Sequence, residues 1–149
     1  MDELLGTIVS AIEDKKGKNI LSLDLRGFDG AVADAFVVCS AESTTQVAAI
    51  ADGIEEKVFE TLGQRPRRTE GMQNAIWVVV DYVDIMVHVF QTQAREFYRL
   101  EELWADAPSV RYGEIQTLFV IIQSHTIYRI IHPLIFYVVS LGLPRGFSQ

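Results

Sequence analysis

Residues 75–90 read AIWVVVDYVDIMVHVF, two apolar runs with a short polar break between them. Residues 75–80 and 85–90 are both rich in β-branched and aromatic side chains, which favour strands. The break from Asp81 to Asp84 is short enough to join two neighbouring antiparallel strands. The spacing therefore predicts a β-hairpin, and the other elements can be placed around it.

Three further elements are predicted within the first 40 residues. Residues 35–40 form a continuous apolar run, which predicts a central strand covered on both faces. Residues 20–25 alternate between apolar and polar positions, as expected for a half-buried strand. Apolar residues at helical spacing predict a first helix that is capped by Asp2 and ends near Lys16.

A longer helix is predicted between the central strand and the hairpin. Ser43-Thr-Thr-Gln46 is a capping-box pattern, in which the Ser43 hydroxyl accepts the backbone N–H of Gln46 and the Gln46 amide reaches back to Ser43. Gly63 supplies a left-handed C-cap. The predicted buried stripe of this helix consists of Val47, Ile50, Ala51, Ile54, Val58 and Leu62.

A last short helix is predicted over residues 94–103. The order of elements is then α-β-β-α-(β)-β-β-α, with a weaker strand just before the hairpin. Alternating helices and strands with one hairpin predict an α/β or α+β fold, in which helices pack on a mixed β-sheet. Phe97, Leu100, Leu103 and Trp104 are expected on one side of this last helix.

Composition limits the classes of function. The chain has 149 residues, 49% of them hydrophobic, which is enough for one domain with a real core. Its 13 basic and 20 acidic residues give a net charge of -7, the wrong sign for a protein that neutralises phosphates, so direct sequence-specific binding to nucleic acid is disfavoured. A single cysteine, Cys39, excludes an internal disulfide, and the acidic N-terminus does not resemble a secretory signal. We therefore expect a soluble, cytoplasmic protein.

The sequence offers few parts of a catalytic site. Asp81 and Asp84 flank the hairpin turn and could hold Mg²⁺, but Asp is common at turns and no phosphate-binding glycine motif accompanies the pair. His88 has no nucleophile with a readable motif beside it, which favours a structural, hydrogen-bonded histidine. Cys39 lies inside an apolar run and is interpreted as an unreactive core thiol. We expect no enzyme, no metal and no cofactor.

Trp77 is the more informative residue, although periodicity leaves two alternatives open. If its ring points outward, Trp77 and Tyr82 beside two carboxylates would form a protein-binding hot spot, where Trp and Tyr are enriched. If it points inward, Trp77 is a core residue and indicates no function. The basic cluster at Arg65, Arg67 and Arg68 is interpreted as a solvated loop.

A series of short motifs runs from about residue 4 to residue 107. They are Leu23-Asp-Leu-Arg-Gly27, Ala33-Asp34, Phe36-Val-Val38, Ser43 with Gln46-Val47, Ile50-Ala-Asp52, Glu70-Gly71, Trp77-Val-Val-Val-Asp81, Asp84, Val87-His-Val-Phe90, Arg95-Glu-Phe-Tyr98, Leu100-Glu101 and Leu103-Trp-Ala-Asp-Ala107. In this order and spacing they resemble the ribosomal silencing factors, also called Iojap-like proteins. Each motif alone is weak, but the series is specific.

The resemblance implies a small non-enzymatic protein with a topology similar to that of nucleotidyltransferases. It implies binding to the large ribosomal subunit through that subunit's fourteenth protein, which blocks joining of the small subunit and represses translation. A metal-dependent nucleotidyltransferase-like enzyme and a membrane-tethered adaptor are the alternatives. Whether the free protein forms a homodimer is left open. Carried over to this sequence, the docking surface would include Trp77, Asp81, Tyr82, Asp84 and His88.

Two positions depart from the family pattern. Val83 stands where the hairpin of the family usually has Gly, and a β-branched residue resists positive φ, so we expect a wider loop. Ala35 replaces an aromatic residue, which could loosen the local core or contact surface.

The resemblance implies a domain over residues 1–107, where its motifs end, and composition sets residues 108–149 apart as an apolar extension. Residues 1–110 hold ten basic and 19 acidic groups, a net of -9, whereas 18 of the 29 residues from 115 to 143 are apolar. Arg129, two histidines and a proline interrupt that stretch, which disfavours membrane contact. Packing on the domain or a dimer partner, and an extension with little evolved structure, stay open as alternatives.

Overall fold

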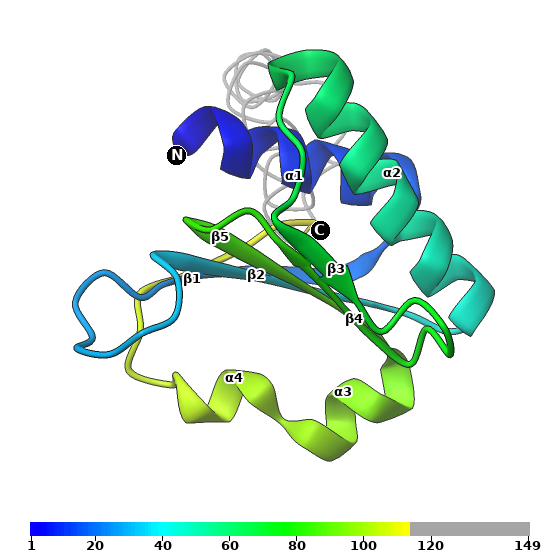
Figure 1. Ribbon diagram of the computed structural model, residues 1–149. Coiled ribbons are helices and arrows are strands. Elements are labelled where there is room, and N and C mark those ends of the chain that lie inside the picture. Colours follow the sequence, from blue (N-terminus) through cyan, green and yellow to red (C-terminus); the bar gives the residue numbers. More distant parts are fainter. Residues whose placement is uncertain (114–149) are drawn as a thin grey trace, which may run out of the picture. The chain divides into compact units, whose positions relative to one another are not determined.

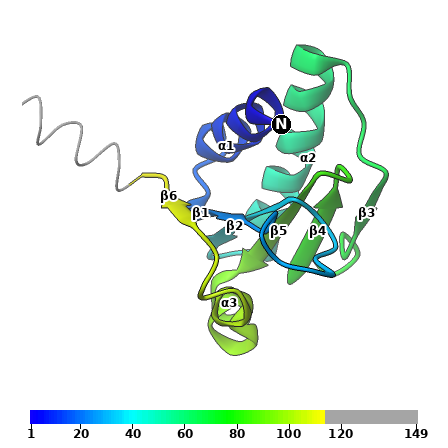
Figure 2. The ribbon, with the colours of Figure 1, turned by 90° about the vertical axis from the view of Figure 1, so that its left-hand side faces the viewer.

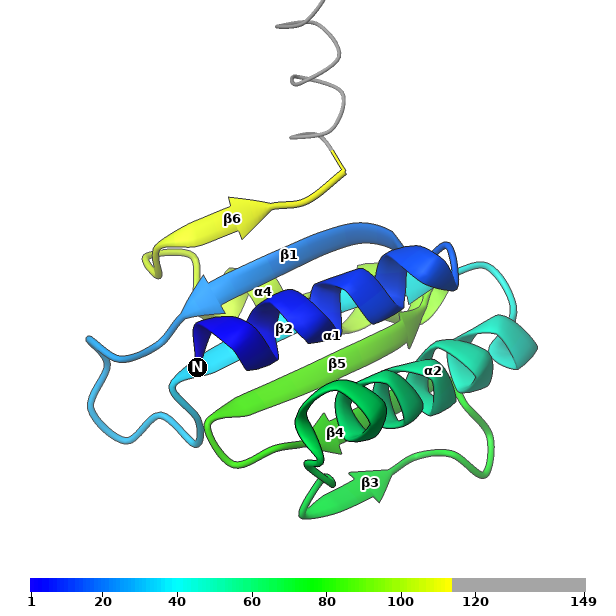
Figure 3. The same cartoon turned by 90° about the horizontal axis from the view of Figure 1, so that it is seen from above.

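The computed structural model describes residues 1–113, which form one compact unit. Its centre is a six-stranded mixed sheet in the order β3-β4-β5-β2-β1-β6. Figure 3 shows the short strands β3 and β6 at opposite edges of this sheet. The strands are β1 (Lys18–Asp24), β2 (Ala35–Ala41), β3 (Arg68–Glu70), β4 (Trp77–Asp81), β5 (Ile85–Gln91) and β6 (Ser109–Arg111).

Helices cover both faces of the sheet. Helices α1 (Asp2–Asp14) and α2 (Thr44–Leu62) lie on one face, here called the α1/α2 face, and the larger hydrophobic core fills the space beneath them. Helices α3 (Thr92–Tyr98) and α4 (Leu100–Leu103) lie on the opposite face, here called the α3 face (Figures 1 and 2). The predicted class, helices packed on a mixed sheet, is confirmed.

The apolar run at residues 35–40 forms the central strand that its composition predicted. All seven residues of β2 are buried, because α1 and α2 cover one side and the aromatic layer of the α3 face covers the other. β2 pairs in parallel with β5 and antiparallel with β1. Cys39 is fully buried, and burial raises the pKa of its thiol to about 12, as expected for a core residue.

Both ends of α2 agree with the sequence pattern, apart from one detail of its capping box. The Ser43 hydroxyl accepts the backbone N–H of Gln46 at 3.1 Å, and Gly63 adopts the left-handed conformation with φ of 66°. The Gln46 amide does not return to Ser43. It donates to the carbonyls of Lys15 and Lys16 instead, both at 3.3 Å, because the end of α1 lies within its reach.

The hairpin forms as predicted, but its turn is tighter than expected. The Tyr82 N–H donates to the Ile85 carbonyl at 2.9 Å, which leaves only Val83 and Asp84 in the loop. The Asp84 N–H also donates to the Tyr82 carbonyl at 3.0 Å, and Val83 has a φ of 75°. This bond across one residue with positive φ is typical of a γ-turn, a strained geometry. The expectation of a wider loop was wrong, because Val83 accepts the strain.

The last predicted helix is interrupted. Arg99 adopts a left-handed conformation with φ of 50°, which separates α3 from α4. The change of direction turns Leu100 and Trp104 towards the sheet, but leaves Phe97 79% and Leu103 76% exposed. The prediction that these four apolar side chains lie on one side of a single helix was therefore wrong.

The N-terminal elements differ from prediction in two further details. Asp2 is the first residue of α1 and not its cap, a position that Met1 occupies. Strand β1 was predicted to be half-buried, yet Ser22 is only 7% exposed, because β6 pairs with β1 on its outer side and Tyr112 lies 3.1 Å from the Ser22 hydroxyl.

Strand β6 extends the compact unit past residue 107 to Gly113. The interpretations of the apolar stretch at residues 115–143 fall outside the described residues. Within residues 1–113, no helix is long and apolar enough to cross a membrane.

Candidate protein-binding surface

Strand pairing places three of the predicted site residues on the α3 face. In the register between β4 and β5, Trp77 lies opposite Phe90, and Val79 lies opposite His88. Asp81 lies opposite Met86 and shares this face, because alternate residues of a strand point the same way. The sheet therefore brings Trp77, Asp81 and His88 to one side.

Trp77 is half-buried, so neither sequence alternative describes it completely. Its ring stacks on Phe90 at 4.7 Å between centroids and lies 5.0 Å from the ring of Tyr98 in α3. Its indole N–H donates to Nδ1 of His88 at 3.1 Å. One part of the ring thus belongs to the protein interior, and another part stays accessible beside Tyr98.

The backbone of Trp77 is closely packed as well as its ring. Gly71 has a φ of 89°, and a Cβ at this position would collide with the carbonyl oxygen of Trp77. Glycine is therefore required here both for its conformation and for the close approach. The Glu70-Gly71 motif thus helps to position the start of β4.

His88 lies beneath the accessible surface and is only 4% exposed. Burial lowers the pKa of His88 to about 4, so its ring is neutral near pH 7. Phe36, Trp77 and Phe90 surround it, with the Phe36 ring centroid at 4.5 Å. A partner could not contact this side chain without displacing the aromatic residues.

Asp81 is fully buried and belongs to the interior of the hairpin. Its carboxylate accepts the Val83 N–H at 2.8 Å and hydrogen bonds from Arg67, and Arg68 lies 3.4 Å away. Burial alone would raise the pKa of Asp81, but the Val83 hydrogen bond and the two arginines outweigh it and hold the pKa below its usual range. This carboxylate is already occupied, which argues against the magnesium hypothesis for Asp81 and Asp84.

The two remaining predicted residues lie apart from Trp77. Tyr82 is 7% exposed and packs in the core of the α1/α2 face, where burial raises the pKa of its hydroxyl. Asp84 is exposed at the tip of the hairpin. Of the five predicted residues, Trp77 and His88 are joined by a side-chain hydrogen bond, Asp84 and Tyr82 by a backbone one, and only Trp77 and Asp84 have side chains within reach of a partner.

Two exposed aromatic residues, Tyr98 and Phe97, complete the surface, and the sequence analysis did not include either in the predicted site. Tyr98 is 51% exposed, and its ring lies 5.1 Å from that of Phe97. With Trp77 they form a continuous row, here called the aromatic surface: Trp77, Tyr98 and Phe97. Their signal was the Arg-Glu-Phe-Tyr motif, but helical spacing alone placed Phe97 on the same side as Leu100 and Trp104, since the break at Arg99 was not foreseen.

Exposed charged side chains lie on the same helices as the aromatic surface. Glu96, Glu102 and Asp106 are exposed along or just after α3 and α4. Arg99, which follows Tyr98, is exposed as well and lies 3.7 Å from the Glu102 carboxylate. The charge beside the rings is therefore mixed, and the acidic excess is a property of residues 1–110 as a whole.

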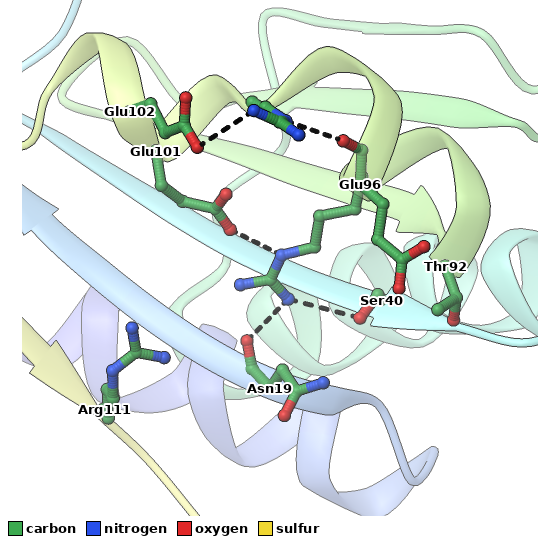
Figure 4. Close-up of a pocket in the computed structure, with 9 residues that line it drawn as sticks. Asn19, Ser40, Thr92, Glu96, Glu101, Glu102 and Arg111 are labelled. Atoms are coloured by element: carbon green, nitrogen blue, oxygen red, sulfur yellow. Dashed lines mark hydrogen bonds and ion pairs between the residues drawn. The ribbon is translucent and has the colours of Figure 1, made fainter.

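A cavity of about 660 Å³ lies between the α3 to α4 segment and the ends of β1, β2 and β6 (Figure 4). Arg95 lines this cavity, and its guanidinium donates to the Asn19 carbonyl at 2.7 Å, to the Ser40 hydroxyl at 3.2 Å and to the Glu101 carboxylate. These bonds attach α3 and α4 to the sheet, so Arg95 has a structural role. Residues 1–113 contain no group of three side chains that could hold a metal ion.

Comparison with known proteins gives a consistent result. The family model described as "Ribosomal silencing factor during starvation" matches residues 1–126. The chain is 42% identical to the ribosomal silencing factor RsfS of Halalkalibacterium halodurans over 108 residues, covering 72% of this chain and 91% of that protein. It is 42% identical to RsfS of Bacillus subtilis over 105 residues, covering 70% and 87%.

Solved structures agree with the sequence relatives. A crystal structure from Bacillus halodurans has a TM-score of 0.64 and 38% identity, covering 75% of this chain and all of the other. A Chromobacterium violaceum structure has a TM-score of 0.66 and 31% identity, covering 70% and 86%. Fold, motifs and relatives together show that this chain belongs to the ribosomal silencing factor family.

Proposed function

We propose that this protein represses translation by binding the large ribosomal subunit through that subunit's fourteenth protein, which keeps the small subunit from joining. Family membership supports a role on the ribosome. The aromatic surface supports the mode of binding, because it combines accessible aromatic rings with a rigid attachment to the sheet. The repression is steric and needs no catalytic group.

The observation that carries the proposal is the continuity of the half-buried Trp77 with two exposed aromatic rings. Tyr98 and Phe97 extend the accessible edge of Trp77 across α3, with ring centroids 5.0 and 5.1 Å apart. Exposed aromatic clusters of this kind are enriched in the centres of protein interfaces. Leaving these rings exposed to water does not stabilise the folded protein, which is a further reason to expect that a partner covers them.

Charge supports a basic protein partner in preference to RNA. Residues 1–110 carry ten basic and 19 acidic groups, a net of -9. Net charge of this sign is repelled by ribosomal RNA and attracted to basic ribosomal proteins between the RNA segments. Asp84 at the hairpin tip adds to this field, whereas the buried Asp81 and Tyr82 contribute by fixing the hairpin.

Sedimentation through sucrose gradients with separated ribosomal subunits tests the proposal. We expect the full chain to migrate with the large subunit and to reduce the fraction of joined ribosomes when small subunits are added. Trp77→Ala should weaken binding by at least tenfold, because it removes the ring that joins the surface to the sheet.

Ile76→Ala is the matched control, because Ile76 precedes Trp77 and is also partly exposed, at 41%, but lies outside the aromatic surface. It should bind as the wild type does. Migration with the small subunit, or unaltered binding by Trp77→Ala, would show that the proposed surface is wrong.

A further inference from the structure

The hydrogen bond between Trp77 and His88 joins an accessible ring to a buried one. Trp77 is half-buried, whereas His88 is 4% exposed, and the 3.1 Å bond runs from the indole N–H to Nδ1. Phe90 stacks on the indole ring from the interior, and Tyr98 lies beside it. Stacking alone allows a ring to slide in its plane, but a hydrogen bond at one end fixes its orientation.

The bond also determines which nitrogen of His88 carries the proton. Since Nδ1 accepts from Trp77, the neutral ring must carry its hydrogen on Nε2. Nε2 is buried and has no hydrogen-bond partner among the described residues. An unpaired buried donor costs stability, and an apolar side chain of similar size would avoid this cost. The histidine is therefore poorly explained as a core residue alone.

We propose that His88 is a positioning residue of the docking surface, which holds the indole of Trp77 in a fixed orientation through Nδ1 so that the aromatic surface is preorganised for its partner. This inference rests on the proposed function for its binding consequence, but the fixing of the ring can be measured without a ribosome. It replaces a direct contact role for His88, which its burial disfavours. Preorganisation favours binding because less side-chain freedom is lost on docking.

Two substitutions distinguish the effect of the Nδ1 acceptor from the effect of the volume of the His88 side chain. His88→Leu removes the acceptor and replaces the imidazole with an apolar side chain of similar volume. His88→Asn keeps an acceptor oxygen near the position of Nδ1. Met86→Leu is the matched control, since Met86 lies two residues before His88 on the same strand and face, where it pairs with Asp81.

The first measurement is hydrogen exchange of the indole N–H groups by NMR. The chain has two tryptophans, Trp77 and Trp104, and Trp77→Phe assigns the two signals. We expect the Trp77 signal to exchange at least tenfold faster in His88→Leu, and to stay close to the wild-type rate in His88→Asn and Met86→Leu. Exchange in His88→Leu at the wild-type rate would overturn the proposal.

The second measurement is the affinity of each full chain for isolated large ribosomal subunits. We expect His88→Leu to weaken binding about five- to tenfold, the effect of one net hydrogen bond. His88→Asn should recover most of the affinity. Equal affinity of His88→Leu and wild type would overturn the positioning role, and so would a loss that His88→Asn does not restore.

Thermal unfolding of the same variants separates positioning from folding. We expect His88→Leu to be about as stable as the wild type, since it also removes the unpaired Nε2 donor. If the wild type itself does not bind large subunits, the docking proposal fails. Fast indole exchange in His88→Leu would then still support the fixing of the ring by His88, and slow exchange would overturn it.

Discussion

Some single residues adopt backbone conformations that are unfavourable for their side chains. Val83 is the main example: a β-branched side chain is 52% exposed at φ of 75° in the hairpin turn. Such residues cost roughly 1–3 kcal/mol and persist only where their surroundings hold them. Here the Asp81 carboxylate accepts the Val83 N–H, and pairing on both sides closes the turn.

Val83→Gly should therefore stabilise the protein. We expect the free energy of unfolding to rise by about 1 kcal/mol, because glycine adopts positive φ without strain and Val83 buries little surface. Urea unfolding measures the change. Val32→Gly is the control: Val32 is 67% exposed without positive φ, so glycine should lower stability there. A loss of stability in Val83→Gly would contradict the proposed strain.

At the scale of elements, the α3 to α4 segment is the part of the fold whose attachment matters most for the aromatic surface. It contributes Tyr98 and Phe97, yet α4 has only four residues and none of them is buried. Arg95 compensates, because its guanidinium binds the Asn19 carbonyl, the Ser40 hydroxyl and the Glu101 carboxylate. One side chain thus joins α3, α4, β1 and β2.

Arg95→Gln should lower the free energy of unfolding by about 2 kcal/mol, because it leaves Glu101 without its partner at a site where the Arg95 side chain is only 11% exposed. Arg99→Gln is the matched control in the same segment. Its ion pair with Glu102 is 67% and 69% exposed, so the loss should be below about 0.5 kcal/mol. Urea unfolding compares the two, and equal losses would contradict the attachment role of Arg95.

The elements also show what the sequence could predict. Helix α2, strand β2 and the hairpin were predictable because capping residues, apolar runs and periodicity are local signals, and each was confirmed. The break at Arg99 and the pairing of β6 with β1 were not predictable, because they depend on contacts between residues far apart in the chain.

The candidate site was predictable only in part, for the same reason. Periodicity could not determine the side on which Trp77 lies. It also could not show that Arg67 would neutralise Asp81, which turned an expected surface carboxylate into a buried one. The orientation of such side chains follows from tertiary packing, which leaves no regular spacing in the sequence.

For the whole molecule, the buried ionisable groups predict how stability depends on pH. His88 has a pKa of about 4 in the fold against an ordinary value of 6.5, so the unfolded chain takes up a proton at higher pH than the folded chain does. The His88 contribution to stability is complete above pH 6.5 and is lost as pH falls from 6.5 to 4. The lowered pKa of Asp81 adds a further loss below about pH 4.

The difference in unfolding free energy between wild type and His88→Leu isolates the histidine. We expect this difference to change by up to about 3 kcal/mol between pH 7.5 and pH 4, to the disadvantage of the wild type. Urea unfolding at several pH values measures it. A constant difference over that range would show that His88 is not buried in neutral form.

The two edge strands of the sheet are short, and this limits the pairing of other chains with the sheet. β3 and β6 each have three residues, and they carry Arg68, Glu70 and Arg111. A strand from another chain could form only a few main-chain hydrogen bonds with either edge strand, because each is three residues long. It would also have to pack beside the charged side chains of these strands. Within residues 1–113, the edges of the sheet thereby oppose fibril-like growth by strand addition beside the water-exposed aromatic row.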